Sequence, residues 1–275
     1  MIVHVANPGD IEKLVAVIPE KAYVLMENFW PGPLTIILPK LPDVPIRVTG
    51  GLDTIAVRCP SNEIARKLIS ISGKFIAAPS ANLSGSPSPT TVRHVIDDLD
   101  GRVDYILSGD DSEIGLESTV IDLSCEIPTI LRPGAITQKM LSAFIGDVIY
   151  DPAILGSADK PKSPGMKYKH YSPNASVEVV IGERSTVSEY IRSKCSSEDN
   201  IGVLTYLEND YDGAKCVLSA GQNMNEYAAS LYYNLRVFDE YGVSKIYAEF
   251  QEDDDMGIAV KNRLYKAAGG NVTRL

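Results

Sequence analysis

The first 150 residues alternate short apolar runs with segments of helical periodicity. Ser61 is the expected N-cap of one helix, and Ser88 with Pro89 is the expected start of another. This alternation is typical of an α/β layer fold. The apolar runs predict strands at 2–5, 34–38, 54–58, 75–78, near Tyr105, at 119–123 and at 129–131, and apolar positions three or four residues apart predict helices at 11–15, 23–30, 61–73 and 90–99.

The last hundred residues repeat the alternation in the order expected of a parallel sheet with helices on its faces. No GxGxxG follows the first of these strands, so a dinucleotide site has no support. Residues 151–174 are rich in Pro, Gly, Lys and Ser and have no periodicity. We therefore predict a domain at 1–150, an interdomain linker at 151–174 and a smaller α/β domain at 175–275, with strands at 177–181, 201–205, 216–219 and 246–249 and helices at 187–193, 227–241 and 258–268.

Composition narrows the class of protein. The chain has 275 residues and a net charge of −10, from 26 Lys and Arg against 36 Asp and Glu, which disfavours a broad surface for nucleic-acid phosphates. Its four cysteines are widely separated and indicate neither a zinc site nor a disulfide framework. No long apolar span indicates a membrane segment. Small anionic ligands remain possible, and a cytoplasmic enzyme fits best.

Several polar residues lie where strands end. The turn from Pro79 to Asn82 follows a predicted strand and precedes a helix, which is where α/β folds bind phosphate. Arg58 closes another strand, where its guanidinium could hold a carboxylate; an ion pair with Glu63 or Asp53 explains the spacing equally well. His4 lies on an apolar strand, where a hydrogen-bonded core histidine is the plainer interpretation. His94 is expected on the surface of its helix.

Six motifs, taken in order, resemble the YrdC-like threonylcarbamoyl-adenylate synthases in their long, two-domain form. The linker from Ser163 to Pro173 also resembles the segment that joins the two domains of the long form. The last third of the chain agrees only in position and α/β pattern. The motifs are Phe29-Trp-Pro-Gly-Pro-Leu-Thr35, Gly50-Gly-Leu-Asp-Thr-Ile-Ala-Val-Arg58, Ala77 to Asn82, Ser88-Pro-Thr90, Gly115-Leu-Glu-Ser-Thr119 and Leu131-Arg-Pro-Gly134.

The resemblance implies a twisted mixed-sheet domain followed by a smaller Rossmann-like parallel domain. It implies formation of threonylcarbamoyl-AMP and pyrophosphate from L-threonine, bicarbonate and ATP with Mg²⁺. The product would pass to a transferase that modifies tRNA. Because the reactants and products are anions, the implied chemistry asks mainly for positioning and charge neutralisation, and no side chain is assigned as a catalytic residue or metal ligand. By resemblance, His4, Arg58, Ala78 and Ser118 would hold threonine, and Thr54, Ser80, Asn82, Ser88, Arg132 and Tyr171 would hold ATP.

One departure from the family pattern concerns the start of the chain, which begins inside a strand. A strand-helix unit with a Lys-x-Arg motif precedes that strand in the family, so this chain is expected to bind Mg-ATP weakly. A non-catalytic module that binds nucleotide or RNA remains the alternative. A serine hydrolase is disfavoured because no GxSxG is present.

Overall fold

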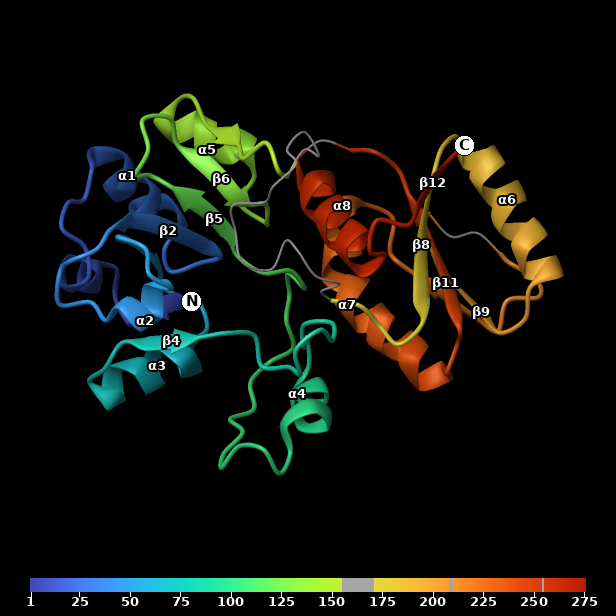
Figure 1. Ribbon diagram of the computed structural model, residues 1–275, viewed down its shortest axis with the longest axis horizontal. Coiled ribbons are helices and arrows are strands. Elements are labelled where there is room, and N and C mark those ends of the chain that lie inside the picture. The colour runs from blue at the N-terminus through green and yellow to red at the C-terminus, as the bar shows by residue number, and fades with distance from the viewer. Residues whose placement is uncertain (155–170, 208–209, 254) are drawn as a thin grey trace. The chain divides into compact units, whose positions relative to one another are not determined.

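The computed structural model of the protein describes residues 1–154, 171–207, 210–253 and 255–275 (Figure 1). Most of the predicted linker, at 155–170, therefore lies outside the described residues. The chain forms two compact units. The described part of the first unit is 1–79 and 117–154, and that of the second is 80–116 with the described residues from 171 onward.

A seven-stranded mixed sheet forms the first unit, in the order β4-β1-β3-β2-β5-β6-β7. β1 pairs parallel with β3 and antiparallel with β4, and β2 pairs parallel with β5. This confirms the predicted mixed sheet. The strands are β1 (Ile2–His4), β2 (Leu34–Pro39), β3 (Thr54–Arg58), β4 (Ile76–Ala78), β5 (Thr119–Asp122), β6 (Thr129–Arg132) and β7 (Ile149–Tyr150), and the helices are η1 (Pro8–Lys13), α1 (Glu20–Phe29), α2 (Ile46–Thr49), α3 (Glu63–Ser72) and α5 (Gln138–Ile145).

Alternation along β3 separates the two faces of this sheet. Ile55 and Val57 are buried in the core, whereas Thr54, Ala56 and Arg58 are half-buried on the opposite face. Residues from α1 and α5 belong to the same core, and at its edge the rings of Phe29 and the half-exposed Phe144 meet edge to face at 5.4 Å. The polar residues of β3 are thus left on the face that the core does not occupy.

Local turn chemistry explains where the sequence prediction was wrong in detail. Asn62, not Ser61, caps α3, because its side chain accepts a hydrogen bond from the Ala65 amide at 2.9 Å. Gly73 ends that helix at φ 62°, as expected. The strand predicted near Tyr105 is absent from the described structure there, and the Tyr105 side chain is 90% exposed.

The second unit contains a five-stranded sheet in the order β10-β9-β11-β8-β12. Its strand pairs are all parallel, as predicted. The strands are β8 (Ser176–Ile181), β9 (Ile201–Thr205), β10 (Cys216–Ser219), β11 (Lys245–Phe250) and β12 (Val272–Arg274), and the helices are α4 (Val92–Leu99), α6 (Arg184–Ser197), α7 (Met224–Tyr241) and α8 (Met256–Ala267).

Helices cover both faces of the parallel sheet, which explains its continuous apolar strands. Along β11, Ile246, Ala248 and Phe250 pack in the core that holds residues of α7 and α8. Tyr247 points the other way, into the core that includes Val187 of α6. Figure 1 shows α6 on one side of the sheet and α7 and α8 on the other.

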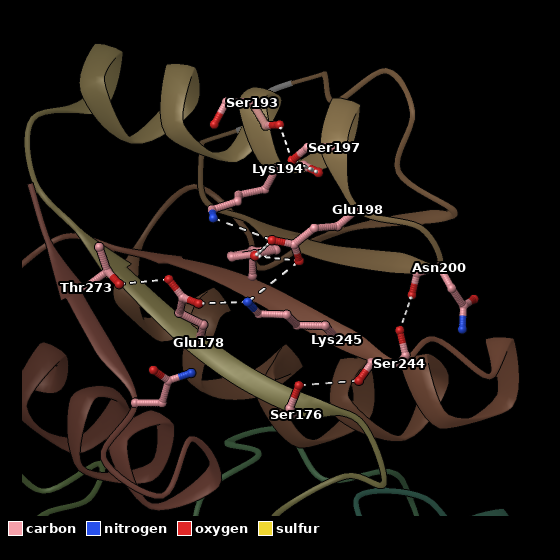
Figure 2. Close-up of polar contacts among 12 residues, drawn as sticks. Ser176, Glu178, Ser193, Lys194, Ser197, Glu198, Asn200, Ser244, Lys245 and Thr273 are labelled. Carbon is pink, nitrogen blue, oxygen red and sulfur yellow. Dashed lines mark hydrogen bonds and ion pairs between the residues drawn. The ribbon is translucent and has the colours of Figure 1, made fainter.

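A polar cluster ties the edge strand β12 to this sheet (Figure 2). The Glu178 carboxylate accepts hydrogen bonds from Thr273 Oγ1 at 2.7 Å and Tyr190 Oη at 2.8 Å, and Lys245 Nζ lies 3.0 Å away. Burial alone would raise the pKa of Glu178, but the bonds from Thr273, Lys245 and Tyr190 hold it below the ordinary value. Because its polar groups pair with one another, we interpret this cluster as structural.

Residues 80–116 belong to the compact unit that contains the C-terminal part of the chain. Gly115 lies so close to α7 that a Cβ there would be 2.4 Å from the Ala228 carbonyl oxygen. The predicted domain 1–150 includes residues 80–116. The compact units instead group these residues with the C-terminal part of the chain. Those domain boundaries and the linker stay a prediction.

Candidate functional site

Strand register places His4 and Arg58 side by side in the first unit. His4 of β1 is the register partner of Arg58 of β3, and both are half-buried on the polar face of the sheet. Ala78 pairs with Ile2 instead, two residues along β1 from His4. Thr54 begins β3, so at about 3.3 Å per residue it lies about 13 Å along the strand from Arg58.

Arg58 and Arg132 place two positive charges at this end of the sheet. Arg58 Nε donates to the Gly32 carbonyl at 3.0 Å. Burial lowers the pKa of Arg58, and the nearby Arg132 charge lowers it further. Among the described residues Arg58 forms no ion pair, so the pairing with Glu63 or Asp53 considered above is not observed there. A carboxylate or phosphate would relieve the repulsion between the two guanidinium groups.

Ser118 connects the second arginine to a buried hydroxyl. Arg132 Nη2 donates to Ser118 Oγ at 2.9 Å, and Arg132 Nε donates to the Ser118 carbonyl at 2.9 Å. Ser118 Oγ also lies 2.7 Å from Thr35 Oγ1. Thr35 was missed as a site residue, although it ends one of the matching motifs; its apolar neighbours made it resemble an ordinary core position. The structure thus brings together Arg58, Arg132, Ser118 and Thr35.

His4 supplies a neutral polar group beside Arg58. Burial lowers the pKa of His4, and the Arg58 charge lowers it further, while the backbone of Ile76 and of Ile2 partly opposes this. Its Nδ1 is buried and has no hydrogen-bond partner among the described residues. A neutral imidazole can donate from one nitrogen and accept at the other, so His4 can serve a ligand that carries both kinds of group.

The other predicted residues lie in the second unit. Ser80 is exposed, whereas Ser88 is 7% exposed. Asn82 Nδ2 donates to the Leu83 carbonyl at 2.8 Å, while its buried Oδ1 has no hydrogen-bond partner among the described residues. The ring of Tyr171 packs against that of Tyr232 at 5.3 Å.

Two expectations about the helix after this loop were wrong. Thr91, not Ser88, caps α4, and its side chain accepts from the His94 amide at 3.3 Å. His94 is not a surface residue; it is 5% exposed, and its Nδ1 accepts the Thr90 amide at 3.2 Å. The burial of His94 results from packing against α7, where the Tyr233 ring lies 5.7 Å away.

Titration of His94 is expected to make stability depend on pH. Burial lowers the pKa of His94 first, and Arg236 lowers it next; Glu240, Asp97 and Asp98 oppose this, and the Tyr233 ring lies 5.7 Å away. Below about pH 6.5 the unfolded chain therefore binds a proton that the folded chain resists, so stability falls as pH falls.

Substituting His94→Asn keeps an acceptor for Thr90 and removes the titration. Thermal unfolding followed by circular dichroism should show a smaller loss of Tm between about pH 7 and pH 5.5 in this variant. His4, whose pKa is also lowered by burial, and the shifted carboxylates remain in the variant and contribute the rest of the slope. An unchanged slope in the variant would contradict the role given to His94.

Comparison with known proteins identifies the family. Residues 1–134 match a family model described as "Telomere recombination", and residues 136–269 match one described as "Threonylcarbamoyl-AMP synthase, C-terminal domain". The threonylcarbamoyl-AMP synthase of Pyrococcus abyssi is 45% identical over 280 residues, which cover 100% of this chain and 82% of the relative. The chain belongs to the threonylcarbamoyl-AMP synthase family. The synthase of Bacillus subtilis is 46% identical over 278 residues, covering 100% of this chain and 80% of the relative.

The fold agrees with this family. The crystal structure of P. abyssi Sua5 complexed with L-threonine is similar with a TM-score of 0.92 and 44% identity, covering 100% of this chain and 81% of that chain. Among the described residues no group of three or more His, Cys, Asp or Glu side chains could hold a metal ion. No helix in the described part of the chain is long and apolar enough to cross a membrane.

Proposed function

We propose that this chain synthesises threonylcarbamoyl-AMP from L-threonine, bicarbonate and ATP. The threonine amine attacks the carbon of bicarbonate, water leaves, and a carbamate forms. A carbamate oxygen then attacks the α-phosphorus of ATP, and pyrophosphate leaves. The arrangement that best supports the proposal is the pair of half-buried arginines, Arg58 and Arg132, beside a neutral imidazole, since every reactant carries negative charge.

The first unit supplies the proposed threonine contacts. We assign the threonine carboxylate to Arg58, whose Nη atoms are left for a ligand when Nε binds Gly32. His4 and Ser118 would hold the amine or its carbamate by hydrogen bonds, and Ala78 would contribute backbone contact. The side chain of Thr35 holds Ser118 in place at 2.7 Å.

The nucleotide contacts follow the same proposal. Arg132 would neutralise phosphate charge while it orients Ser118, to which it donates two hydrogen bonds. Thr54, Ser80, Asn82, Ser88 and Tyr171 are the other proposed ATP contacts. Mg²⁺ is proposed to arrive on the triphosphate, where it would neutralise charge as pyrophosphate leaves. Cytoplasmic location and transfer of the product to a tRNA-modifying enzyme belong to this proposal.

Pyrophosphate release from ATP tests the proposed reaction. We expect release that requires both threonine and bicarbonate, together with a threonylcarbamoyl adduct of AMP detected by mass spectrometry. Release that is independent of threonine, or binding of nucleotide without release, would contradict the proposal and favour a binding module. The weak Mg-ATP binding expected from the sequence stays a prediction, and calorimetric titration measures it directly.

A further inference from the structure

A loop in the second unit carries two of the proposed ATP-binding residues at its ends. Asn82 and Ser88 bracket the turn 83–87, whose glycine has φ 96°. Asn82 Nδ2 donates to the carbonyls of Leu83 and Ser86, at 2.8 Å and 3.1 Å. These two bonds close the turn but join it to no other part of the unit.

The Arg236 guanidinium of α7 binds this loop directly. Its Nε and Nη2 donate to the Pro87 carbonyl at 3.2 Å and 2.6 Å. The Pro87 carbonyl belongs to the peptide group that includes the Ser88 nitrogen. Arg236 therefore helps to fix the backbone at Ser88 and, with it, the position of the Ser88 side chain.

The same guanidinium forms a bidentate ion pair with Asp98 of α4. Arg236 Nη2 lies 2.7 Å from Asp98 Oδ2, and Nη1 lies 3.2 Å from Oδ1. Asp98 Oδ2 in turn accepts the Leu83 amide at 3.2 Å. Each side chain of the pair is only 11% exposed, so water competes little with these bonds.

A second contact reaches the middle of the loop from another part of the chain. The Ser172 amide donates to the Gly85 carbonyl at 3.0 Å, and Ser172 Oγ donates to the Ala267 carbonyl of α8 at 2.9 Å. The loop is thus held at Leu83, Gly85 and Pro87, and two of the three contacts use C-terminal residues.

We infer that Arg236, together with Asp98, positions the loop 82–88 for ATP, so that the C-terminal part of the chain contributes a positioning residue to the nucleotide site. The inference depends on the proposed function for the identity of the ligand. Arg236 itself is not assigned a contact with substrate. Its planar guanidinium group donates to the Pro87 carbonyl and the Asp98 carboxylate at the same time, which a lysine ammonium cannot reproduce.

Substituting Arg236→Gln should raise the KM or Kd for ATP about tenfold, because one charge-assisted contact to the loop is lost. The Kd for threonine should stay within about twofold. Hydrogen exchange should accelerate at the Leu83 amide and across residues 83–90. Arg236→Lys keeps the charge but cannot bind Pro87 and Asp98 with a planar guanidinium group. It should also weaken ATP binding without weakening threonine binding, by a smaller factor. If the glutamine variant does not fold, the lysine variant provides the test.

Arg93→Ala provides a matched control. Arg93 pairs with Asp97 on the same helix α4 at 2.9 Å, but the two side chains are 77% and 43% exposed. Its removal should leave ATP affinity and loop exchange unchanged. Unaltered loop exchange or unaltered ATP affinity in the Arg236 variants would overturn the inference, as would an equal loss of threonine affinity.

Failure of the two proposals can be told apart. If the wild-type chain binds ATP but releases no threonine-dependent pyrophosphate, the proposed reaction is wrong, and the variants still decide the positioning role. If the wild-type chain makes the product and the Arg236 variants match it in ATP affinity and in loop exchange, only the inference is wrong.

Discussion

Replacing Arg58 with methionine is expected to weaken threonine binding by about a hundredfold, because a carboxylate loses a charge-assisted pair of hydrogen bonds. The guanidinium is held by the Gly32 carbonyl and lies beside Arg132. Methionine is unbranched and uncharged, so the change removes the guanidinium charge and keeps the apolar stem of the side chain. Calorimetric titration with L-threonine measures the effect without requiring turnover.

Arg66→Met serves as the matched control for this substitution. Arg66 also donates from Nε to a backbone carbonyl, that of Ala6 at 3.2 Å, but it is not among the proposed ligand contacts. Its threonine Kd should stay close to that of the wild type. Equal losses in the two variants would show that the arginines act through folding and would remove the support for a carboxylate site at Arg58.

Replacing Gly115 with alanine is expected to cost about 3 kcal/mol of unfolding free energy. Gly115 has φ 72°, and an added Cβ would lie 2.4 to 2.6 Å from backbone atoms of Ala228 and Ala229 in α7. Backbone atoms inside a helix cannot move aside as the end of a side chain can. Urea unfolding of the variant should show a lower midpoint.

Gly101 separates the two causes of that cost. It has nearly the same φ, 71°, but no atom lies within 4 Å of where its Cβ would be. Gly101→Ala should therefore cost about 1 kcal/mol, from backbone strain alone. If both variants lose the same stability, close packing of Gly115 against α7 contributes nothing.

The architecture could be predicted from the sequence because strands and helices leave a repeated pattern of apolar and polar residues along the chain. Along β3, Ile55 and Val57 alternate with Thr54 and Arg58, so the pattern of the sequence matches the two faces of the observed strand. The parallel sheet of the second unit was predicted from the order of alternating strands and helices. The short elements α2, β7 and β12 have too few residues to show a period.

The side-chain environments depended on tertiary contacts that no local pattern reports. His94 was expected on the surface, since its burial depends on Tyr233, which is distant in the sequence. Thr35 was missed because a hydroxyl among apolar residues acquires meaning only when Ser118 is 2.7 Å away. Arg236 carries no local motif; its importance follows from contacts with Pro87 and Asp98.

The contact between α4 and α7 bears on how this protein can be divided. A cut between residues 134 and 136, where the two family matches meet, separates Asp98 from Arg236. An N-terminal fragment made in this way would keep a buried carboxylate without its cation and would expose the apolar side chain of Leu116, now 9% exposed. Residues 1–134 produced alone are therefore expected to be less stable around α4 than the same residues in the full chain.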